Sequence, residues 1–252
     1  MNRAVYTVTS GGIAALARLE AVAQNLANAN TAGYKAERLL FRVRELARPP
    51  GGVDAGVPLD PVLDRTAAQV VEVASVRDFS QGPVRASGNP LDVAITGQGF
   101  FAVATARGER YTRQGTFTRD GEGYLVTQHG ERVQGEAGDI RLGTGDVVIG
   151  QDGSIAVDGA TVGRLKLVGF GDEPALVPEG AALFAPAPGA APEPLDATAV
   201  RLEPGAVEAA NVDAVASMVE LVDVARGFES YMHAMQRLDE VAQRSINDVG
   251  RV

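Results

Sequence analysis

The sequence contains no cysteine and no tryptophan, and it has only two histidines, His129 and His233. Without cysteine the chain can form neither a disulfide framework nor a thiolate metal site. A metal would need carboxylates beside a histidine, and the sequence has neither a His-x-x-x-His pair nor a close acidic cluster. No apolar run approaches the roughly 20 residues that cross a bilayer. We therefore expect no cofactor, no metal and no membrane insertion.

Signatures of catalysis and of nucleotide binding are missing as well. The sequence has no Gly-x-Ser-x-Gly elbow, and the glycines at 97/99 and 143/145 do not extend into a Gly-x-Gly-x-x-Gly loop. A net charge of −9 disfavours a general affinity for nucleic acid. Asp and Glu are numerous enough to leave a catalytic carboxylate pair open, but no motif selects one. We predict a chain that is not an enzyme and that binds neither nucleic acid nor a small-molecule substrate.

What the sequence does have is an apolar seam near each end, with alternating spacings of three and four residues. Such a repeat places one narrow apolar stripe on a helix, and that stripe needs a partner helix. We predict one helix over residues 2–34, broken at Gly33, and another over about 213–248. The first seam comprises Val5, Val8, Gly12, Ala15, Leu19, Val22 and Leu26. The second comprises Leu221, Val224, Phe228, Tyr231, Met235, Leu238, Ala242 and Val249, interrupted only by Ser245.

The two ends also carry opposite charge. Residues 1–48 hold seven Arg or Lys and three Glu, whereas residues 213–248 hold seven acidic residues and three Arg. Net charges of +4 and −4 favour pairing of the two helices, within one molecule or between neighbours. The same charges equally fit two solvated helix faces.

Residues between the helices are rich in glycine and proline and have the pattern of short strands. Residues 91–96 alternate as a half-buried strand. Turn signals predict hairpins in an antiparallel assembly. Residues 35–44 form a basic arm, extended or helical, and proline-rich stretches follow at 49–61 and 174–204. The turn signals are Asp120-Gly121, Glu122-Gly123, His129-Gly130, Asp152-Gly153 and Asp158-Gly159.

These patterns predict an α+β fold. Long N- and C-terminal helices pair as a coiled coil, and the central domain is mainly antiparallel β, sandwich- or barrel-like. We expect residues 1–47 to form the N-terminal helix and arm, 48–69 a linker, 70–204 the central β domain with its proline-rich return segment, and 205–252 the C-terminal helix.

Three blocks of sequence resemble the signatures of the flagellar basal-body rod and hook protein family. Residues 24–35 read Gln-Asn-Leu-Ala-Asn-Ala-Asn-Thr-Ala-Gly-Tyr-Lys, similar to the family's N-terminal signature. Residues 88–103, with 111–117 and 125–127, resemble its central β signature, and residues 205–213 its C-terminal one. Gln24 and Ala210 depart from the family's usual Asn and Ser. The short β body and residues 2–6 are most similar to a proximal-rod member.

The resemblance implies a structural subunit of the proximal rod of the flagellar basal body. Such a subunit assembles helically with copies of itself and other rod proteins through its terminal helices, transmits torque and lines the export channel. The resemblance further implies passage through the flagellar type III export apparatus into the periplasm. No cleaved signal peptide is expected, because residues 1–34 lack a charged segment followed by an apolar run.

On this resemblance and on the seams we assign two sets of site residues. The predicted assembly interface is Val5, Leu19, Val22, Asn25, Leu26, Asn28, Thr31, Gly33, Tyr34, Asn211, Val212, Leu221, Val224, Phe228, Tyr231, Met235 and Leu238. The β-domain signature is Leu91, Asp92, Gly97, Gly99, Phe100, Phe101, Tyr111, Thr112, Arg113, Gly115 and Phe117.

Three other interpretations remain open. The chain could be a distal-rod protein of the same family. It could be a cell-wall-acting enzyme that carries oligomerising helices, although no motif supplies an acid pair. It could also be a binding module that grips a partner through Phe100, Phe101 and Tyr111, aromatic residues that more often belong to a core.

Overall fold

The computed structural model describes residues 2–45, 69–171, 176–180, 182–195 and 200–249. The predicted linker, with Pro49, Pro50, Pro58 and Pro61, lies almost wholly outside these residues. So do the side chains of residues 2–7, 43–45, 69–72, 242 and 245–249, which include the predicted seam residues Val5, Ala242 and Val249. The chain divides into two compact units, which we call the helical unit (Met1–Leu26, Glu37–Val76 and Ala214–Val252) and the β body (Ala27–Ala36 and Arg77–Asp213).

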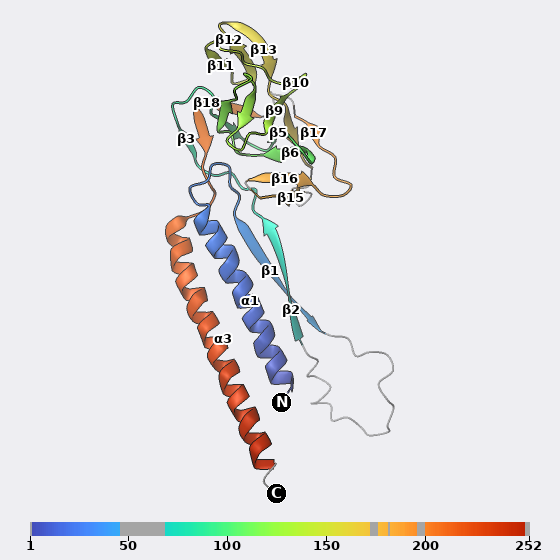
Figure 1. The fold of residues 1–252 in the computed structure, drawn as a ribbon, viewed down its shortest axis with the longest axis vertical. Coiled ribbons are helices and arrows are strands. Elements are labelled where there is room, and N and C mark those ends of the chain that lie inside the picture. The colour runs from blue at the N-terminus through green and yellow to red at the C-terminus, as the bar shows by residue number, and fades with distance from the viewer. Residues whose placement is uncertain (1, 46–68, 172–175, 181, 196–199, 250–252) are drawn as a thin grey trace. The chain divides into compact units, whose positions relative to one another are not determined.

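The described residues of the helical unit form two helices and a two-stranded ribbon (Figure 1). The helices are α1 (Asn2–Ala27) and α3 (Ala214–Val249), and the ribbon pairs β1 (Glu37–Glu45) with β2 (Gln69–Arg77). The helices run in opposite directions, because Thr9 of α1 contacts Met235 of α3 and Arg18 contacts Glu220. The basic arm predicted at 35–44 is mostly a β-strand, because β1 begins at Glu37.

Helix α1 is shorter than the sequence predicts. It ends at Ala27 instead of near Gly33. Asn28 and Thr31 close a turn beyond it, in which both the backbone N and the Oγ1 of Thr31 donate to Asn28. Short polar side chains stabilise such turns in preference to further helix. Gly33 then adopts a φ of +67°, in the left-handed region that favours glycine. The C-terminal helix, α3, has 36 residues and confirms the predicted span within one residue.

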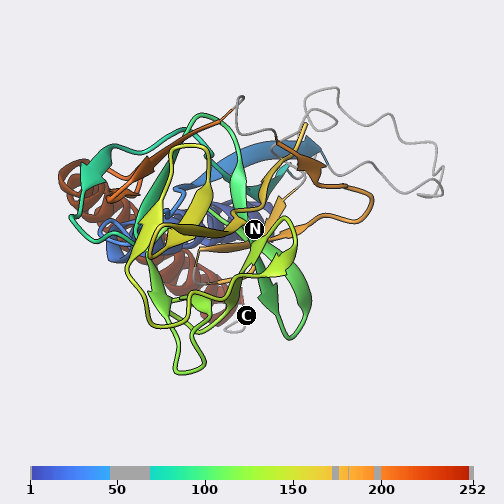
Figure 2. The ribbon, with the colours of Figure 1, turned by 90° about the horizontal axis from the view of Figure 1, so that it is seen from above.

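The β body consists of short strands joined by tight turns, seen from another side in Figure 2. Every strand pairing with a defined register in its described part is antiparallel. The predicted α+β class with a mainly antiparallel body is thus confirmed. The strands are β3 (Val84–Ala86), β4 (Val93–Thr96), β5 (Phe100–Thr105), β6 (Gly108–Thr112), β7 (Phe117–Arg119), β8 (Leu125–Thr127), β9 (Arg132–Gly135), β10 (Gly138–Asp139), β11 (Val147–Ile149), β12 (Ser154–Val157), β13 (Ala160–Arg164), β14 (Leu167–Gly169), β15 (Leu176–Pro178), β16 (Leu183–Pro186), β17 (Glu193–Pro194), β18 (Arg201–Pro204) and β19 (Ala206–Glu208).

The largest sheet has the order β15-β16-β6-β5-β9-β8-β7, with β10, β14 and β17 attached beside this path. The strands β11, β12 and β13 form a second sheet, and the late strands β18 and β19 return to pair with the early strands β4 and β3. The predicted turn signals at 120–123, 129–130, 152–153 and 158–159 connect successive antiparallel strands. Local turn chemistry therefore determined these hairpins.

Strand β5 lies between two apolar clusters of the body. Phe101 and Val103 belong to one cluster, and Phe100 and Ala102 belong to the other. This alternation follows from the two-residue period of a strand that is covered on both faces. Strand β4 is likewise buried along Val93–Ile95, so the predicted half-buried strand exists but lacks the exposed face that its alternation suggests.

Candidate functional site

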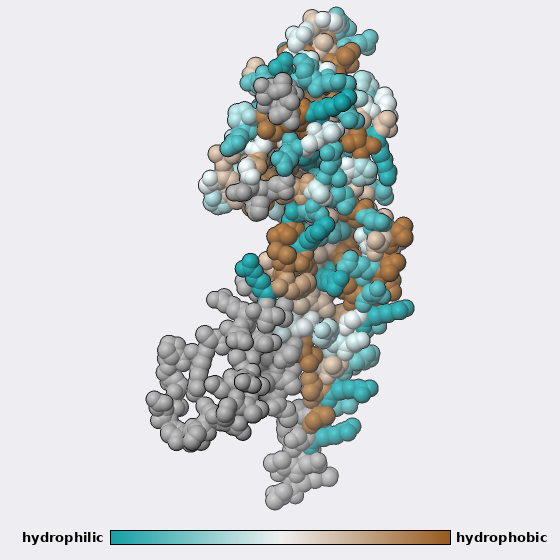
Figure 3. Space-filling view, turned by 180° about the vertical axis from the view of Figure 1, so that it is seen from behind, coloured by the Kyte–Doolittle hydropathy of each residue, from teal (hydrophilic) through white to brown (hydrophobic). Residues whose placement is uncertain are grey.

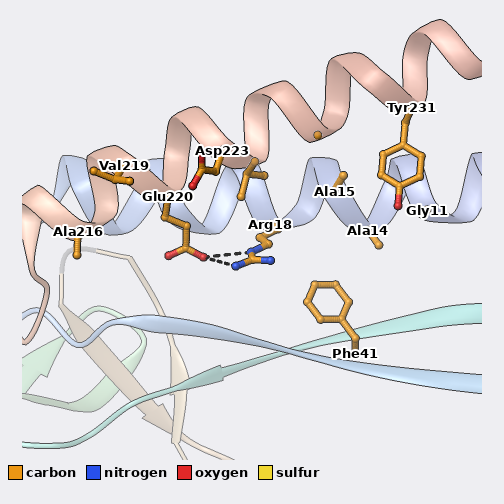
Figure 4. Close-up of a pocket in the computed structure, with 12 residues that line it drawn as sticks. Gly11, Ala14, Ala15, Arg18, Phe41, Ala216, Val219, Glu220, Asp223 and Tyr231 are labelled. Carbon is orange, nitrogen blue, oxygen red and sulfur yellow. Dashed lines mark hydrogen bonds and ion pairs between the residues drawn. The ribbon is translucent and has the colours of Figure 1, made fainter.

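A groove of about 760 Å³ lies within the helical unit, between α1, α3 and the inner face of β1 (Figure 4). Small residues line it on the α1 side, namely Gly11, Ala14 and Ala15. The rings of Phe41 from β1 and Tyr231 from α3 form aromatic walls. Small side chains let another backbone or a large side chain approach closely, so the groove is shaped to receive an apolar group.

The contact between Gly11 and Tyr231 explains why α1 carries glycine in its interior. A Cβ at position 11 would lie 2.8 Å from Cε1 of Tyr231, closer than real Cβ contacts come. At Gly12 the nearest atom, Cβ of Tyr231, would be 4.0 Å away, an ordinary contact. A methyl group at position 11 would therefore force the Tyr231 ring to shift, whereas one at position 12 would not.

Charged side chains also face the groove. Arg18 and Glu220 form an ion pair at 2.6 Å, with 53% and 43% of their side chains exposed. This pair joins the basic N-terminal region to the acidic C-terminal helix, as the opposite charges predicted. Asp223 also lines the groove, and it makes no ion pair with any residue that the structure describes. The groove thus keeps one unneutralised carboxylate.

The seam residues of the two helices differ in how far they are covered. Val22 and Val224 are buried, and Tyr231 and Met235 remain exposed. Met235 accepts a contact from Thr9 Oγ1 at 3.4 Å. The half-buried members of the predicted interface in this unit are Leu19, Asn25, Leu26, Leu221, Phe228 and Leu238.

Further apolar residues of the helical unit are exposed that the predicted interface does not include. Ile13 is 61% exposed on α1, and Val215 is 72% exposed on α3, followed by Met218 and Val222. The spacing of three and four along 215, 218 and 222 could have identified this second stripe of α3. In Figure 3, apolar side chains (brown) reach the surface along the helices, next to polar ones (teal).

In the β body, residues from all three sequence signatures meet in one buried ionic cluster. The Lys35 ammonium lies 2.8 Å from Glu208 Oε1, and Arg113 Nη1 lies 3.4 Å from Glu208 Oε2. Their side chains are 1%, 0% and 4% exposed in the order Lys35, Glu208, Arg113. We call these three residues the ionic cluster.

Each member of the ionic cluster is held by further hydrogen bonds. Lys35 Nζ donates to the carbonyl oxygens of Ser80 and Phe79 as well as to Glu208, which uses the three donors of an ammonium. Arg113 Nη2 donates to Gly97 O at 2.6 Å. Burial lowers the pKa of Lys35, and the attraction of Glu208 opposes this shift.

Asn211 connects the segment after α1 to the segment before α3, inside the β body. Its Oδ1 accepts from the backbone N of Ala36 at 2.7 Å, and its Nδ2 donates to Asp78 O at 2.7 Å. The backbone N of Gly33 donates to Glu208 O at 2.8 Å. Tyr34 is buried, and Arg77 Nη1 donates to its hydroxyl at 3.1 Å.

The residues of the predicted interface are therefore divided between the helical unit and the β body. Gly33, Tyr34 and Asn211 make their contacts within the β body, together with the turn residues Asn28 and Thr31, while Val212 is half-buried beside them. Asn25 bonds both backbone groups of Glu37 at 2.8 and 2.9 Å. The side chains of Asn25, Asn28 and Asn211 thus form hydrogen bonds within the chain, next to the ends of the helices.

The β-signature residues build the body's interior. A Cβ at Gly115 would lie 1.7 Å from Val93 O, so only glycine fits there. Thr112 Oγ1 donates to Ala182 O at 2.9 Å. The remaining signature residues are core or turn positions: Asp92, Phe100, Phe101, Tyr111, Arg113 and Phe117 are buried, Leu91 is half-buried, and Gly97 and Gly99 have positive φ.

Within the described residues, no three His, Asp or Glu side chains gather as metal ligands would. Neither described helix combines the length and the apolar composition that crossing a bilayer requires. The features that stand out are thus a groove with exposed apolar helix faces in one unit, and a tightly bonded junction in the other.

Comparison with known proteins agrees with this arrangement. Residues 6–35 match a family described as "Flagella basal body rod protein". Residues 94–157 match "Flagellar hook protein FlgE/F/G D1 domain", and residues 203–248 match "Flagellar basal body rod FlgEFG protein C-terminal".

Full-length relatives carry the same names. The chain is 35% identical over 257 residues to the flagellar basal-body rod protein FlgF of Caulobacter vibrioides, with all of both chains covered. It is 33% identical to FlgF of Escherichia coli, with 97% of each chain covered. It is 29% identical to the rod protein FlgG of Bacillus subtilis, with 98% of this chain and 99% of the relative covered.

The class that these matches define is the structural protein of the flagellar rod and hook. The chain belongs to the flagellar basal-body rod protein family, and it is FlgF-like. The predictions of this family and of a structural rod subunit are confirmed.

Proposed function

We propose that the chain is a subunit of the proximal rod and that it joins the rod through the exposed faces of α1 and α3. The observation that carries the proposal is the exposed apolar surface of these helices, with Ile13 on α1 and Val215, Met218 and Val222 on α3. Soluble monomers rarely expose apolar stripes of this kind unless a partner covers them.

In the proposed assembly α1 and α3 pair as a coiled coil, and neighbouring subunits cover the remaining apolar stripe. Burying apolar surface stabilises by about 25 cal/mol per Å², which the free subunit does not gain on its exposed faces. A rod needs a heterologous contact, in which one face of a subunit meets a different face of the next, because such contacts need not close on themselves. Other rod proteins and further copies of this chain are the proposed partners.

Family membership further supports a location in the flagellar basal body. We infer that the subunit stands in the periplasmic rod, transmits torque and lines the export channel. Delivery through the flagellar type III export apparatus, without cleavage of a signal peptide, also stays a prediction. Analysis of purified basal bodies for the mature N-terminus of this protein would test delivery and location together.

The helix-mediated mechanism is tested by placing a charge in each seam. Leu26→Asp and Leu238→Asp each place a carboxylate at a half-buried seam position. We therefore expect each to abolish incorporation into the rod, measured as the amount of the chain in purified basal bodies. Val148→Asp, at an exposed position of the β body, is the matched control and should incorporate normally. Normal motility of either seam variant would contradict the mechanism.

The distal rod is the second candidate position, because full-length relatives include proteins named FlgG as well as FlgF. Labelling the chain in purified basal bodies separates the two, since only a proximal subunit lies at the base of the rod. A wall-digestion assay with the purified protein would test the enzymatic alternative, for which activity above background would be required.

A further inference from the structure

The groove of the helical unit carries an unneutralised carboxylate, Asp223, and farther along the groove it carries two aromatic rings (Figure 4). Asp223 faces the groove and forms no ion pair within the described chain, while Phe41 and Tyr231 are 45% and 41% exposed. A carboxylate attracts a guanidinium through its charge, and aromatic rings offer an apolar surface to an aliphatic side chain. The groove therefore suits a segment that presents an arginine beside an apolar side chain.

The outer face of β1 is such a segment. Phe41 points into the groove, and side chains alternate along a strand, so Leu40 and Arg42 lie on the opposite face of β1. Leu40 is 48% exposed, Arg42 is exposed, and Arg42 makes no ion pair with the residues that the structure describes. Arg38 shares this face.

We propose that the groove of one subunit receives the outer face of β1 from a second copy of this chain, with Leu40 against the aromatic walls and Arg42 paired with Asp223. The proposal rests on the proposed rod function and names the surface and the partner through which it operates. Charge complementarity supports it, because Arg42 is an exposed cation on β1 and Asp223 belongs to a C-terminal helix region of net charge −4.

The proposed contact joins two different surfaces of the subunit, the groove and the outer face of β1. The groove lies on one side of β1, and the side chains that would enter a neighbour's groove lie on the other. A subunit that offers Leu40 and Arg42 to the next subunit therefore keeps its own groove open for a third. Such a contact is heterologous and repeats without closing on a pair.

Cross-linking of full-length single-cysteine variants tests the proposal, because the natural sequence has no cysteine. Leu40→Cys protein mixed with Val219→Cys protein, which carries its thiol in the groove, should form a 40–219 disulfide dimer under oxidation. Val148→Cys replaces Val219→Cys as the control, since Val148 is exposed on the β body. Only molecules of different variants can form the mixed product, so contacts within one chain cannot produce it.

Charge reversal then tests the proposed ion pair. Asp223→Arg in the groove variant, or Arg42→Asp in the strand variant, should each lower the yield of the 40–219 product by about tenfold through like-charge repulsion. Combining the two reversed proteins should restore the yield, because the pair is then rebuilt in the opposite sense. Both positions are exposed, and circular dichroism should show that each variant keeps the native fold.

Three results would overturn the inference: a 40–219 yield no higher than that of the Val148 control, a 219–219 product in excess of the mixed one, or no rescue by the double reversal. The same cysteine variants expressed in flagellated cells separate this inference from the proposed function. If basal bodies contain the chain but position 219 cross-links there only to another rod protein, the inference fails and the rod function stands. If basal bodies do not contain the natural chain, the rod function fails, and the mixing experiment still decides the contact.

Discussion

Glu208 takes part in both buried ion pairs of the ionic cluster in the β body. It neutralises both Lys35 and Arg113, and its Oε1 also accepts from the backbone N of Gly82 at 2.8 Å. A carboxylate buried this completely gives little net stabilisation relative to an apolar core, but removing it leaves two cations without a counter-charge. Residue identity at position 208 is therefore fixed by positions that are far away in sequence.

We predict that Glu208→Gln lowers the free energy of unfolding of the β body by about 3–5 kcal/mol, because the buried cations lose their partner. Denaturant unfolding followed by near-UV circular dichroism measures this. Glu220→Gln removes a carboxylate from the exposed pair with Arg18 and should cost no more than about 1 kcal/mol. An equal loss of unfolding free energy in the two variants would show that burial does not increase the contribution of the ionic cluster to stability.

Tyr111 gives the protein a dependence on alkaline pH. Burial, with the hydrogen bond from its hydroxyl to Glu109, raises the pKa of Tyr111 from its ordinary value of 10.0 to about 12. The folded state thus holds this proton more tightly than the unfolded state. The resulting stabilisation is complete below pH 10 and is lost as the pH rises towards 12.

We therefore predict that the free energy of unfolding of the natural protein falls more steeply between pH 10 and 12 than that of Tyr111→Phe. The difference should reach no more than about 2 kcal/mol. Equilibrium unfolding across this range, on both proteins, isolates the contribution because the other titrating groups are shared. Parallel curves would refute the assignment.

Among the structural elements, the helices show how the same residue type can serve different purposes at neighbouring positions. Gly11 accommodates the Tyr231 ring of α3, whereas Gly12 has room for a methyl group. In helical peptides glycine is about 1 kcal/mol less favourable than alanine, so the helix gains from alanine wherever packing allows it.

We predict opposite effects for the two alanine substitutions. Gly12→Ala should raise the stability of the helical unit by up to about 1 kcal/mol, and Gly11→Ala should lower it because the new Cβ displaces Tyr231. Thermal unfolding followed by far-UV circular dichroism measures both. If Gly11→Ala stabilised the unit as much as Gly12→Ala does, the packing of Tyr231 on α1 would be refuted.

Elements with local signals could be predicted from the sequence, and those made by distant pairing could not. The span of α3 and the hairpins at 120–123 and 152–153 follow from heptad spacing and from Asp-Gly turns. The β1–β2 ribbon has no such signal, because its strands are separated by more than twenty residues. The ionic cluster could not be predicted from the sequence for the same reason, since Lys35 and Glu208 meet only after the chain has folded.

Over the whole molecule, the two units interleave along the chain. Residues 27–36 and 205–213 belong to the β body although they adjoin the helices, and residues 69–76 belong to the helical unit although they adjoin the body. The predicted domains are contiguous blocks of sequence, and no local pattern in the sequence indicates such an exchange. The exposed apolar stripe of α3 lies outside the predicted seam, because Val215, Met218 and Val222 occupy other positions of the heptad.

The difference in burial between the units predicts a difference in their dynamics before assembly. We expect backbone amides of β4, β5 and β9 to exchange with solvent much more slowly than those of α1 and α3 in a verified monomer, because few buried contacts hold the helices. Hydrogen exchange with mass spectrometry measures this. Strong protection throughout residues 5–28 of the monomer would contradict it.

The position of Glu208 also has a consequence for synthesis of the chain. A ribosome makes Lys35 and Arg113 long before it makes the carboxylate that neutralises them. A product of premature termination between codons 113 and 208 would hold both cations with no anion to accompany them inside the body. The buried charges of the body are therefore balanced only once β19, its last strand, has been made.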